Sequence, residues 1–463
     1  MAQSLDRLLK PSTLAVIGAS TDITKIGGRF LNSFLKAGFT GKLYPVHLKG
    51  REIMGLKVYP SVLDVPDEID LALLTIPAGA AEEAMKQCAR KGVKFAVIHG
   101  TGFSEIGAMG RELEARVLQI ARDGGVRVVG PNCMGIFGPE VKMNTIVAAY
   151  ELPFDPGPVG FFGQSGWVCE NTVLWGSQRG LRFSGAISSG NQADLDVLDY
   201  LDYFGSDSET RVIGAYQEGI KDGKSLLTQA RSISRVKPIV IWKSGRSTAG
   251  ARAVASHTAS LAVSSPVTEA ALKQAGILRA GSLEELLDLM IGFCAPYLPK
   301  GKRIGILVES GGGGAAAADA CEPVGLEVPE IPEEIQQEFV DFTSGKIPPT
   351  VGTTNPVDIA WAPARDTGMF WLGCMEILEK AVDVLMVMQY HNMGDKGFIQ
   401  GVVELMERAE KPIVLIPGHP STQAEGMAEC VRNGIPAYPT PVRAVKAIQA
   451  MTEYAGYVHA GLR

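Results

Sequence analysis

Short apolar runs of four to six residues alternate along the chain with longer stretches in which apolar residues recur every three or four positions. The short runs are typical of strands buried on both faces, and the longer periodic stretches are typical of amphipathic helices. Strand-like runs in the first part of the chain occupy residues 14–17, 43–46, 71–76, 95–98 and 126–129. This alternation predicts a doubly wound parallel α/β domain over residues 1–130.

The same alternation returns twice further along the chain. It starts again at residues 159–162 and a third time at residues 304–308. Three prolines within residues 151–158 interrupt the pattern before the first restart and indicate a connecting segment. We therefore predict three α/β domains, at residues 1–130, 158–298 and 299–463, with a linker at residues 131–157.

A strand, a glycine turn and a helix form a repeated unit in the second and third domains. In each copy a Ser-Gly pair follows a strand-like run, and a Gly-Leu pair begins fifteen positions after the serine. The start of a helix leaves backbone N–H groups unpaired, and these groups together with the helix dipole favour a bound phosphate. The candidate phosphate-binding residues are Gln164, Ser165 and Gly166 in the first copy and Ser310, Gly311 and Gly312 in the second. The alternative is that both are ordinary turns in two similar domains.

Composition narrows the class of protein. Of the 463 residues, 46% are apolar and 20% are charged, as in ordinary globular proteins. The net charge of -6 argues against a broad nucleic-acid surface but is compatible with a local anion site. The seven cysteines are widely spaced with no CxxC pair, so we expect no metal site and no disulfide framework, and a reducing cytoplasm fits best. We find no signal-peptide layout and no apolar run of membrane-spanning length, so we expect no membrane association.

The first domain offers a candidate ligand site at the carboxyl ends of its strands, where doubly wound sheets bind their ligands. The turn after the first strand lacks the full GxGxxG pattern, so one alternative is that Gly18 only closes a tight turn. Two lysines nearby favour an anionic, phosphate-bearing ligand. The candidate residues of this site are Gly18, Ala19, Ser20, Lys25, Lys49, Ile76 and Pro77.

One histidine stands out in the second domain. His257 lies between the strand-like run 238–242 and a helical segment that begins near residue 265. The residues between them are small, basic and hydroxyl-rich, which predicts a mobile loop, and Ser256 and Thr258 flank the imidazole. An imidazole can act as a nucleophile near neutral pH, and neighbouring hydroxyl groups can hold an anion. We therefore interpret His257 as a reversible phosphoryl acceptor; the alternative is an ordinary polar loop residue.

Other polar groups are expected near the same edge of the sheet. Glu218 ends a strand-like run there, and its carboxylate can fix the tautomer of the imidazole and support its charge. The alternative is a solvated acid at the end of a strand. A polar turn at residues 188–194 follows another strand, and Pro356 makes residues 355–358 a rigid loop that can line the same cleft.

These motifs resemble the α subunit of the NDP-forming acyl-CoA synthetases, the ADP-forming acetate–CoA ligase group related to succinyl-CoA synthetase. The resemblance covers nearly the whole chain. The most specific match is the stretch from Lys243 to Leu261 around His257. Supporting matches are Gly163-Gln-Ser-Gly166, Ser189-Gly-Asn-Gln-Ala-Asp194, Gly130-Pro-Asn-Cys133 and Asn355-Pro-Val-Asp358. The chain departs from the family pattern at Ala259, where glycine is common, and at His47, where asparagine is common.

The resemblance implies an α/β fold with a Rossmann-like CoA-binding domain followed by two flavodoxin-like ligase domains. In such a protein the first-domain residues above bind coenzyme A, His257 carries the phosphoryl group, Glu218 supports it, and the two glycine-started helices bind the phosphate. The resemblance further assigns Gly190, Asn191, Gln192, Asp194, Ser256 and Thr258 to the phosphohistidine loop and the acyl site.

The implied reaction is acid + CoA + ATP ⇌ acyl-CoA + ADP + phosphate, through an acyl phosphate and phosphohistidine. Because three α/β units account for the length of the chain, no ATP-grasp domain is expected in it. We therefore predict a separate β subunit that binds ATP or GTP with Mg²⁺, in an α₂β₂ assembly. The substrates are a small carboxylic acid and a CoA thioester; the sequence leaves open which acid, ADP or GDP, and the physiological direction.

Two other functions stay open at this point. One is a noncatalytic CoA-responsive binding protein, which would have no use for a histidine between two phosphate sites. The other is an NAD(P)-dependent oxidoreductase, for which the chain lacks the full dinucleotide fingerprint and an acidic ribose-binding residue at the expected place.

Overall fold

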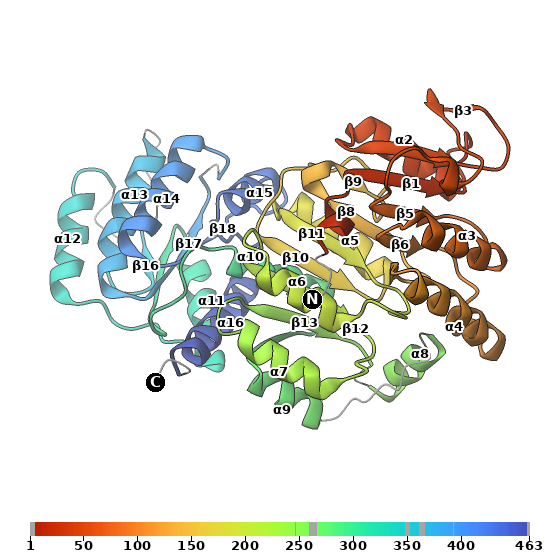
Figure 1. Ribbon diagram of the computed structural model, residues 1–463. Coiled ribbons are helices and arrows are strands. Elements are labelled where there is room, and N and C mark those ends of the chain that lie inside the picture. Colours follow the sequence, from red (N-terminus) through yellow and green to blue (C-terminus); the bar gives the residue numbers. More distant parts are fainter. Residues whose placement is uncertain are drawn as a thin grey trace. The chain divides into compact units, whose positions relative to one another are not determined.

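The computed structural model describes residues 5–245, 247–258, 266–347, 352–360, 366–391 and 393–460 (Figure 1). The chain divides into two compact units. Unit 1 holds residues 1–177 and 182–283, and unit 2 holds residues 178–181 and 284–463. None of the helices in the described part of the chain is both long enough and apolar enough to cross a membrane.

Unit 1 begins with a five-stranded parallel sheet in the order β2-β1-β5-β6-β7. Its central strands are buried on both faces, as the apolar runs predict. The strands are β1 (Thr13–Ile17), β2 (Lys42–Val46), β5 (Leu71–Leu74), β6 (Phe95–Ile98) and β7 (Arg127–Val129). The helices and small elements around them are α1 (Asp6–Leu9), α2 (Ile26–Ala37), α3 (Ala78–Lys91), α4 (Ala108–Asp123), β3 (Glu52–Ile53), β4 (Leu56–Lys57) and the 3₁₀ turns η1 (Val62–Asp64) and η2 (Ser104–Ile106).

The second sheet of unit 1 has seven strands in the order β14-β13-β12-β10-β11-β8-β9. Its five parallel strands are β10 (Val159–Gly163), β11 (Phe183–Ser188), β12 (Val212–Gln217), β13 (Ile239–Lys243) and β14 (Ile277–Ala280). Two antiparallel strands extend one edge, β8 (Gly135–Gly138) and β9 (Met143–Asn144), joined by η3 (Pro139–Val141). The helices are α5 (Gly166–Gln178), α6 (Val197–Ser206), α7 (Gly223–Ile233), α8 (Thr248–Thr258) and α9 (Pro266–Gln274).

Strands β8 and β9 lie inside the segment that we interpret from the sequence as a linker. The sequence pattern does not reveal these strands, because strands of four and two residues are too short to show an alternating pattern. The predicted domain boundaries at residues 130, 157 and 298 stay predictions.

Unit 2 contains a four-stranded parallel sheet in the order β16-β15-β17-β18. The strands are β15 (Ile304–Val308), β16 (Val357–Asp358), β17 (Val384–Gln389) and β18 (Ile413–Pro417). The helices are α10 (Leu283–Phe293), α11 (Gly311–Cys321), α12 (Glu333–Thr343), α13 (Thr367–Leu378), α14 (Lys396–Ala409), α15 (Ala424–Arg432) and α16 (Pro441–Ala460), with 3₁₀ turns η4 (Glu322–Val324) and η5 (Glu379–Ala381).

All three sheets share one strand order. Counted along the parallel strands of each sheet, the order is 2-1-3-4, and a fifth strand continues it in both sheets of unit 1. This is the flavodoxin-like order, in which the crevice for a ligand opens between the first and third strands, at their carboxyl ends. The three switch points, where this strand order places a ligand crevice, therefore lie between β1 and β5, between β10 and β12, and between β15 and β17. The fold class predicted from the sequence is confirmed.

The two sheets of unit 1 share a hydrophobic core. One continuous cluster of buried side chains includes Leu14 and Phe95 from the first sheet and Ile213 from the second. Within it the ring of Phe162 on β10 stacks on that of Phe204 on α6, with centroids 6.4 Å apart and an interplanar angle of 6°. Because this apolar surface is buried jointly, the two sheets pack as one body.

Candidate active site

The first crevice is built by close packing around Gly18. Its φ of +95° is a left-handed conformation, and a Cβ there would lie 2.9 Å from the carbonyl oxygen of Thr75 and from Cγ2 of Ile76. Only glycine fits this turn. A Cβ at Gly27 would overlap the carbonyl oxygen of Gly18, so the first turn of α2 rests directly on the turn after β1. The start of α2 thereby opens into the crevice between β1 and β5.

The predicted first-domain residues lie around this crevice with different exposures. Ala19 is buried, and the N–H groups of Gly18 and Ala19 both donate to the carbonyl oxygen of Val46, at 3.0 and 3.2 Å. These two N–H groups are therefore already hydrogen-bonded within the protein. Lys25 is exposed at the N-cap position of α2, where a cation faces any anion held by the helix start. Of the others, Ser20 and Ile76 are half-buried, and Lys49 and Pro77 are exposed.

In the second crevice, the side chain of Gln164 links the segment after β10 to the segment after β12. The side-chain carbonyl oxygen of Gln164 accepts hydrogen bonds from the N–H groups of Glu218, at 2.6 Å, and Gly219, at 2.9 Å. Gln164 is 7% exposed and follows β10, whereas Glu218 follows β12. Ser165 accepts from the N–H of Val168 at 3.4 Å, so its hydroxyl group caps the first turn of α5. Gln164 thus holds the start of α5 and Glu218 on opposite sides of one switch point.

Glu218 is buried and held from several sides. It is 5% exposed, and the hydroxyl group of Tyr216 donates to its Oε1 at 3.4 Å. The ammonium group of Lys243 donates to the backbone carbonyl oxygen of Glu218 at 2.6 Å and to that of Ser244 at 2.8 Å. Burial lowers the pKa of Lys243, and the charge of Glu218 opposes that shift. The alternative of a solvated acid at the end of a strand is wrong.

The loop predicted around His257 is wrong for residues 248–258, which form helix α8. The hydroxyl group of Ser247 accepts from the N–H of Gly250 at 3.0 Å and caps the helix start. Four alanines among the eleven residues of α8 supply the helix propensity that outweighs the small and hydroxyl-bearing residues on which the loop prediction rested. The backbone of Ser256, His257 and Thr258 forms the last turn of α8; their side chains, and residues 259–265, lie outside the described part of the chain. Helix α8 contacts η2.

The polar turn after β11 adjoins the second crevice. The N–H and the hydroxyl group of Ser189 both donate to the carbonyl oxygen of Gly163, at 2.8 and 3.0 Å. The side-chain amide of Gln192 donates to the hydroxyl group of Ser189 at 2.9 Å. A Cβ at Gly190 would overlap the carbonyl oxygen of Pro131, so the turn packs tightly on the segment that follows β7.

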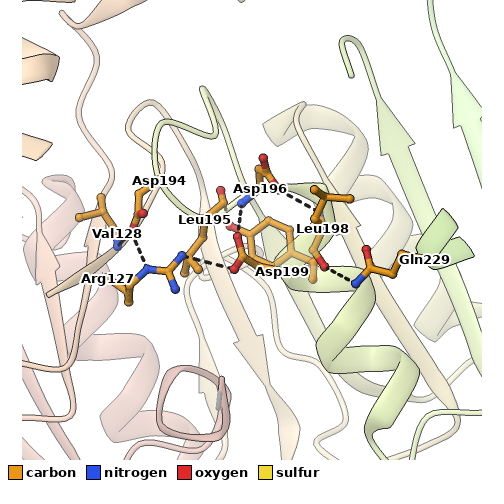
Figure 2. Close-up of polar contacts among 9 residues, drawn as sticks. Arg127, Val128, Asp194, Leu195, Asp196, Leu198, Asp199 and Gln229 are labelled. Atoms are coloured by element: carbon orange, nitrogen blue, oxygen red, sulfur yellow. Dashed lines mark hydrogen bonds and ion pairs between the residues drawn. The ribbon is translucent and has the colours of Figure 1, made fainter. Parts of the chain in front are cut away.

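Two predicted residues of this turn are engaged by the first sheet. The amide of Asn191 donates to the carboxylate of Glu105 at 2.8 Å. Asp194 accepts from Arg127 Nε at 2.9 Å and from the N–H of Val128 at 2.8 Å (Figure 2). Arg127 and Glu105 are not among the residues predicted from the sequence, because no local pattern indicates contacts between residues more than sixty positions apart.

The corresponding crevice of unit 2 repeats the bridge with a carboxylate. Glu309, after β15, accepts from the N–H of Tyr390, after β17, at 2.8 Å. Ser310 caps the start of α11, and a Cβ at Gly311 would lie 3.1 Å from Asp358 Oδ2. Asp358 of the predicted rigid loop therefore reaches the helix start.

Asn355 in the same loop contacts the backbone of β15 and not the helix start. Its side chain bonds the backbone of Ile304 and Ile306, at 2.8 and 2.9 Å, and so holds β15. Within the described ranges, no three His, Cys, Asp or Glu side chains gather in a group that could hold a metal ion.

The sheets share this strand order, helices that begin at or near a glycine follow their switch points, and one crevice holds a buried carboxylate. These features together are typical of an α/β protein that binds anionic ligands. The CoA binding domain family matches residues 12–139, and the family of succinyl-CoA ligase like flavodoxin domains matches residues 156–292. The α subunit of ADP-forming acetate–CoA ligase II from Pyrococcus furiosus is 34% identical over 99% of this chain and 99% of its own length. ADP-forming acetate–CoA ligase I from Archaeoglobus fulgidus is 34% identical over 97% of this chain and 64% of its own length.

A solved structure agrees with these relatives. The dinucleotide forming acetyl-coenzyme A synthetase 1 of Candidatus Korarchaeum cryptofilum, in complex with phosphate and ADP, matches with a TM-score of 0.86 and 36% identity over 99% of both chains. The chain belongs to the family of ADP-forming acyl-CoA synthetases, as an α-subunit member, and is an acid–thiol ligase. The family and the enzyme class predicted from the sequence are confirmed, and the family membership favours the ligase over the oxidoreductase alternative.

Proposed function

We propose that this chain interconverts acyl-CoA, ADP and phosphate with a carboxylic acid, CoA and ATP, and that His257 carries the phosphoryl group. A phosphate oxygen attacks the thioester carbonyl carbon, the C–S bond breaks, and the thiol of CoA leaves with a proton. A nitrogen of His257 then attacks the phosphorus of the acyl phosphate, and the carboxylate leaves. Transfer from phosphohistidine to ADP completes the cycle and restores the imidazole.

The observation that carries this proposal is the bridge made by Gln164. Its carbonyl oxygen, bonded to the N–H groups of Glu218 and Gly219, ties the start of α5 to a buried carboxylate. The unpaired N–H groups and the positive end of the α5 dipole favour a phosphate. The carboxylate of Glu218, on the other side of the same crevice, would favour the protonated or phosphorylated imidazole of His257. Both requirements of a phosphohistidine site are thus supported in one crevice.

We assign the remaining roles on the same basis. Gln164, Ser165 and Gly166 would hold the phosphate at α5, and Ser310, Gly311 and Gly312 would hold it at α11. Coenzyme A would occupy the crevice between β1 and β5, where Lys25 and Lys49 match its phosphates and the start of α2 favours an anion. The acyl group would lie against the turn of Gly190, Asn191, Gln192 and Asp194, with Ser256 and Thr258 beside the phosphohistidine.

A second subunit is part of the proposal. The Pyrococcus furiosus relative, named an α subunit, has almost the same length as this chain, whereas the Archaeoglobus fulgidus relative is about half as long again. We propose that a separate ATP-grasp β subunit binds ATP or ADP with Mg²⁺, which would neutralise charge on the nucleotide, in an α₂β₂ assembly. All seven cysteines are buried and free, which supports a reducing cytoplasm as the site of action. The substrate would be a small carboxylic acid.

The test is phosphorylation of the assembled enzyme. Incubation with acyl-CoA and labelled phosphate should place an acid-labile label on the wild-type chain and none on His257→Asn. The matched control is His459→Asn, an exposed histidine in the last turn of α16, which should label normally. Glu218→Gln should label more slowly. Label on His257→Asn, or no label on the wild type with a range of acyl-CoA thioesters, would overturn the proposal.

A further inference from the structure

The turn between β11 and α6 runs alongside the end of β7 from the first sheet. The N–H of Asn191 donates to the carbonyl oxygen of Pro131 at 3.0 Å, and that of Ala193 donates to Gly130 at 3.0 Å. The N–H of Leu195 donates to the carbonyl oxygen of Val128 at 3.1 Å. The turn therefore belongs to the second sheet by sequence but is shaped by the first sheet, whose carboxyl ends form the proposed CoA crevice.

Arg127 anchors one end of this turn. Its Nε donates to Asp194 Oδ2 at 2.9 Å and its Nη2 donates to Asp199 Oδ1 at 3.3 Å, so one guanidinium joins the turn to the first residues of α6 (Figure 2). The side chains of Arg127, Asp194 and Asp199 are 30%, 15% and 30% exposed, so the group is only partly screened by water. Burial lowers the pKa of Arg127, but the hydrogen bonds and charges of the two aspartates outweigh burial and raise it.

Asn191 anchors the other end. Its Nδ2 donates to the hydroxyl group of Ser104 at 3.0 Å and to the carboxylates of Glu105 and Glu114 at 2.8 and 3.1 Å. Glu105 also accepts from the N–H of Gly102 at 2.6 Å, which fixes η2 itself. Because α8 contacts η2, this anchor lies next to the helix that carries His257.

The backbone takes a left-handed conformation on both sides of Asn191. Gly190 and Gln192 both have positive φ angles, 53° and 52°. For a residue with a side chain, such as Gln192, the left-handed conformation costs on the order of 1–2 kcal/mol and persists only where the surroundings over-determine it. The anchors at Asn191 and Arg127 supply that constraint. Without the guanidinium, two partly buried carboxylates would face each other near the turn, and the turn would relax.

We propose that Arg127 is a positioning residue for the acyl-transfer half of the reaction, because it holds the turn 190–194 against the CoA sheet in the conformation that receives the acyl group. The inference rests on the proposed function and adds a residue that does not touch the reacting atoms. It separates two routes to phosphohistidine. The route from acyl-CoA and phosphate needs the turn in place, whereas the route from ATP delivers the phosphoryl group without the acyl site.

The test compares both routes in the enzyme assembled with its partner subunit. For Arg127→Gln we expect the rate of labelling from acyl-CoA and labelled phosphate to fall by about 10- to 100-fold, the loss typical of a misplacement of about 1 Å. Labelling from γ-labelled ATP should stay within about twofold of wild type, since a merely structural defect would slow both routes alike. The matched control is Arg116→Gln, which removes an exposed arginine paired with Glu82 at 3.2 Å and should leave both rates unchanged.

Two further variants complete the design. Arg127→Lys keeps the charge but loses the fork that reaches both aspartates, so its acyl-driven rate should lie between wild type and Arg127→Gln. Adding Asp194→Asn to Arg127→Gln should cost less than the two single losses combined, because both remove the same contact.

Three results would overturn the inference. They are an unchanged acyl-driven rate in Arg127→Gln, an equal loss in both routes, and additive losses in the double variant. If Arg127→Gln does not fold, the two labelling rates are compared instead in Arg127→Lys and in Asp199→Asn, which removes the charge of the second carboxylate that Arg127 bonds. Normal labelling of His257→Asn would instead refute the proposed function, independently of Arg127.

Discussion

Exchanging the amide of Gln164 for a carboxylate changes the charge of the second crevice without removing its central hydrogen bonds. In Gln164→Glu, a carboxylate oxygen would still accept from the N–H groups of Glu218 and Gly219, which bond the amide oxygen at 2.6 and 2.9 Å. A related contact exists in unit 2, where Glu309 accepts from the N–H of Tyr390 at 2.8 Å, but Glu309 is half-buried, whereas Gln164 is buried and bonds the residue that carries a second carboxylate. We therefore expect Gln164→Glu to lower the free energy of unfolding by about 1–3 kcal/mol, because it buries a second carboxylate beside Glu218.

The new charge should also weaken the binding of phosphate. The new charge would lie no more than about 7 Å from a phosphate held by residues 164–166, because two steps of roughly 3.8 Å separate the Cα atoms of residue 164 and Gly166. At that distance and an effective dielectric constant of about 20, two unit charges of like sign repel by about 2 kcal/mol, or roughly 30-fold in affinity. The phosphate carries this charge in the ground state and in the transition state alike. The KM for phosphate should therefore rise about 30-fold while kcat changes little.

The assay is the steady-state rate of the assembled enzyme at varied phosphate, with thermal unfolding measured on the same preparations. Gln164→Ala is the comparison, because it leaves the buried N–H groups of Glu218 and Gly219 unpaired. It should lose stability by about 1–3 kcal/mol as well as activity. A normal KM for phosphate in a correctly folded Gln164→Glu enzyme would refute the assignment of the α5 start as the phosphate site.

Two other predictions concern stability and reactivity. Asp288 is 5% exposed and accepts two hydrogen bonds of 2.6 Å from Arg443, so Asp288→Asn should lower the free energy of unfolding by about 3–5 kcal/mol in denaturant titrations. Glu410→Gln, which removes an exposed ion pair, should cost no more than about 1 kcal/mol, and an equal cost for the two variants would contradict this reasoning. All seven cysteines are buried, and burial raises the pKa of Cys88 and Cys133 to about 12. A raised pKa keeps a thiol protonated, so the native protein should not react with a thiol reagent between pH 7 and 9, and seven thiols should react after unfolding; rapid labelling of the native protein would show that a cysteine is accessible.

The sheets and their crevices are predictable from the sequence because the signal is local. A strand buried on both faces needs an unbroken apolar run, and a glycine turn after it, as at Gly18, marks the place where a helix begins. The same holds for Gln164 to Gly166, since a serine cap and a glycine helix start are read within a few residues. The predicted site residues of the second crevice, including Glu218, therefore lie where the strand ends put them.

The remaining features depend on contacts that no local pattern contains. Arg127 meets Asp194 across 67 positions, and it stands at the start of an otherwise ordinary strand. The backbone of Glu218 is bonded by Lys243 and Gln164, which approach it from two other strands. Helix α8 is different, because the alanines of residues 248–258 are a local signal for a helix, and their propensity outweighs the small and hydroxyl-bearing residues that indicate a loop.

The seven-stranded sheet of unit 1 and the four-stranded sheet of unit 2 share one strand order, but their carboxylates stand at different positions around the switch point. In unit 1 the amide of Gln164 precedes the helix start and the carboxylate of Glu218 stands across the crevice; in unit 2 the carboxylate of Glu309 precedes the helix start and Tyr390 stands across it. A carboxylate directly before a helix start competes with any other anion for the positive end of the dipole. Asp358, beside Gly311, strengthens that competition at α11. The charge distribution therefore favours the start of α5 as the stronger of the two proposed phosphate sites, with the buried carboxylate of Glu218 on the other side of the same switch point.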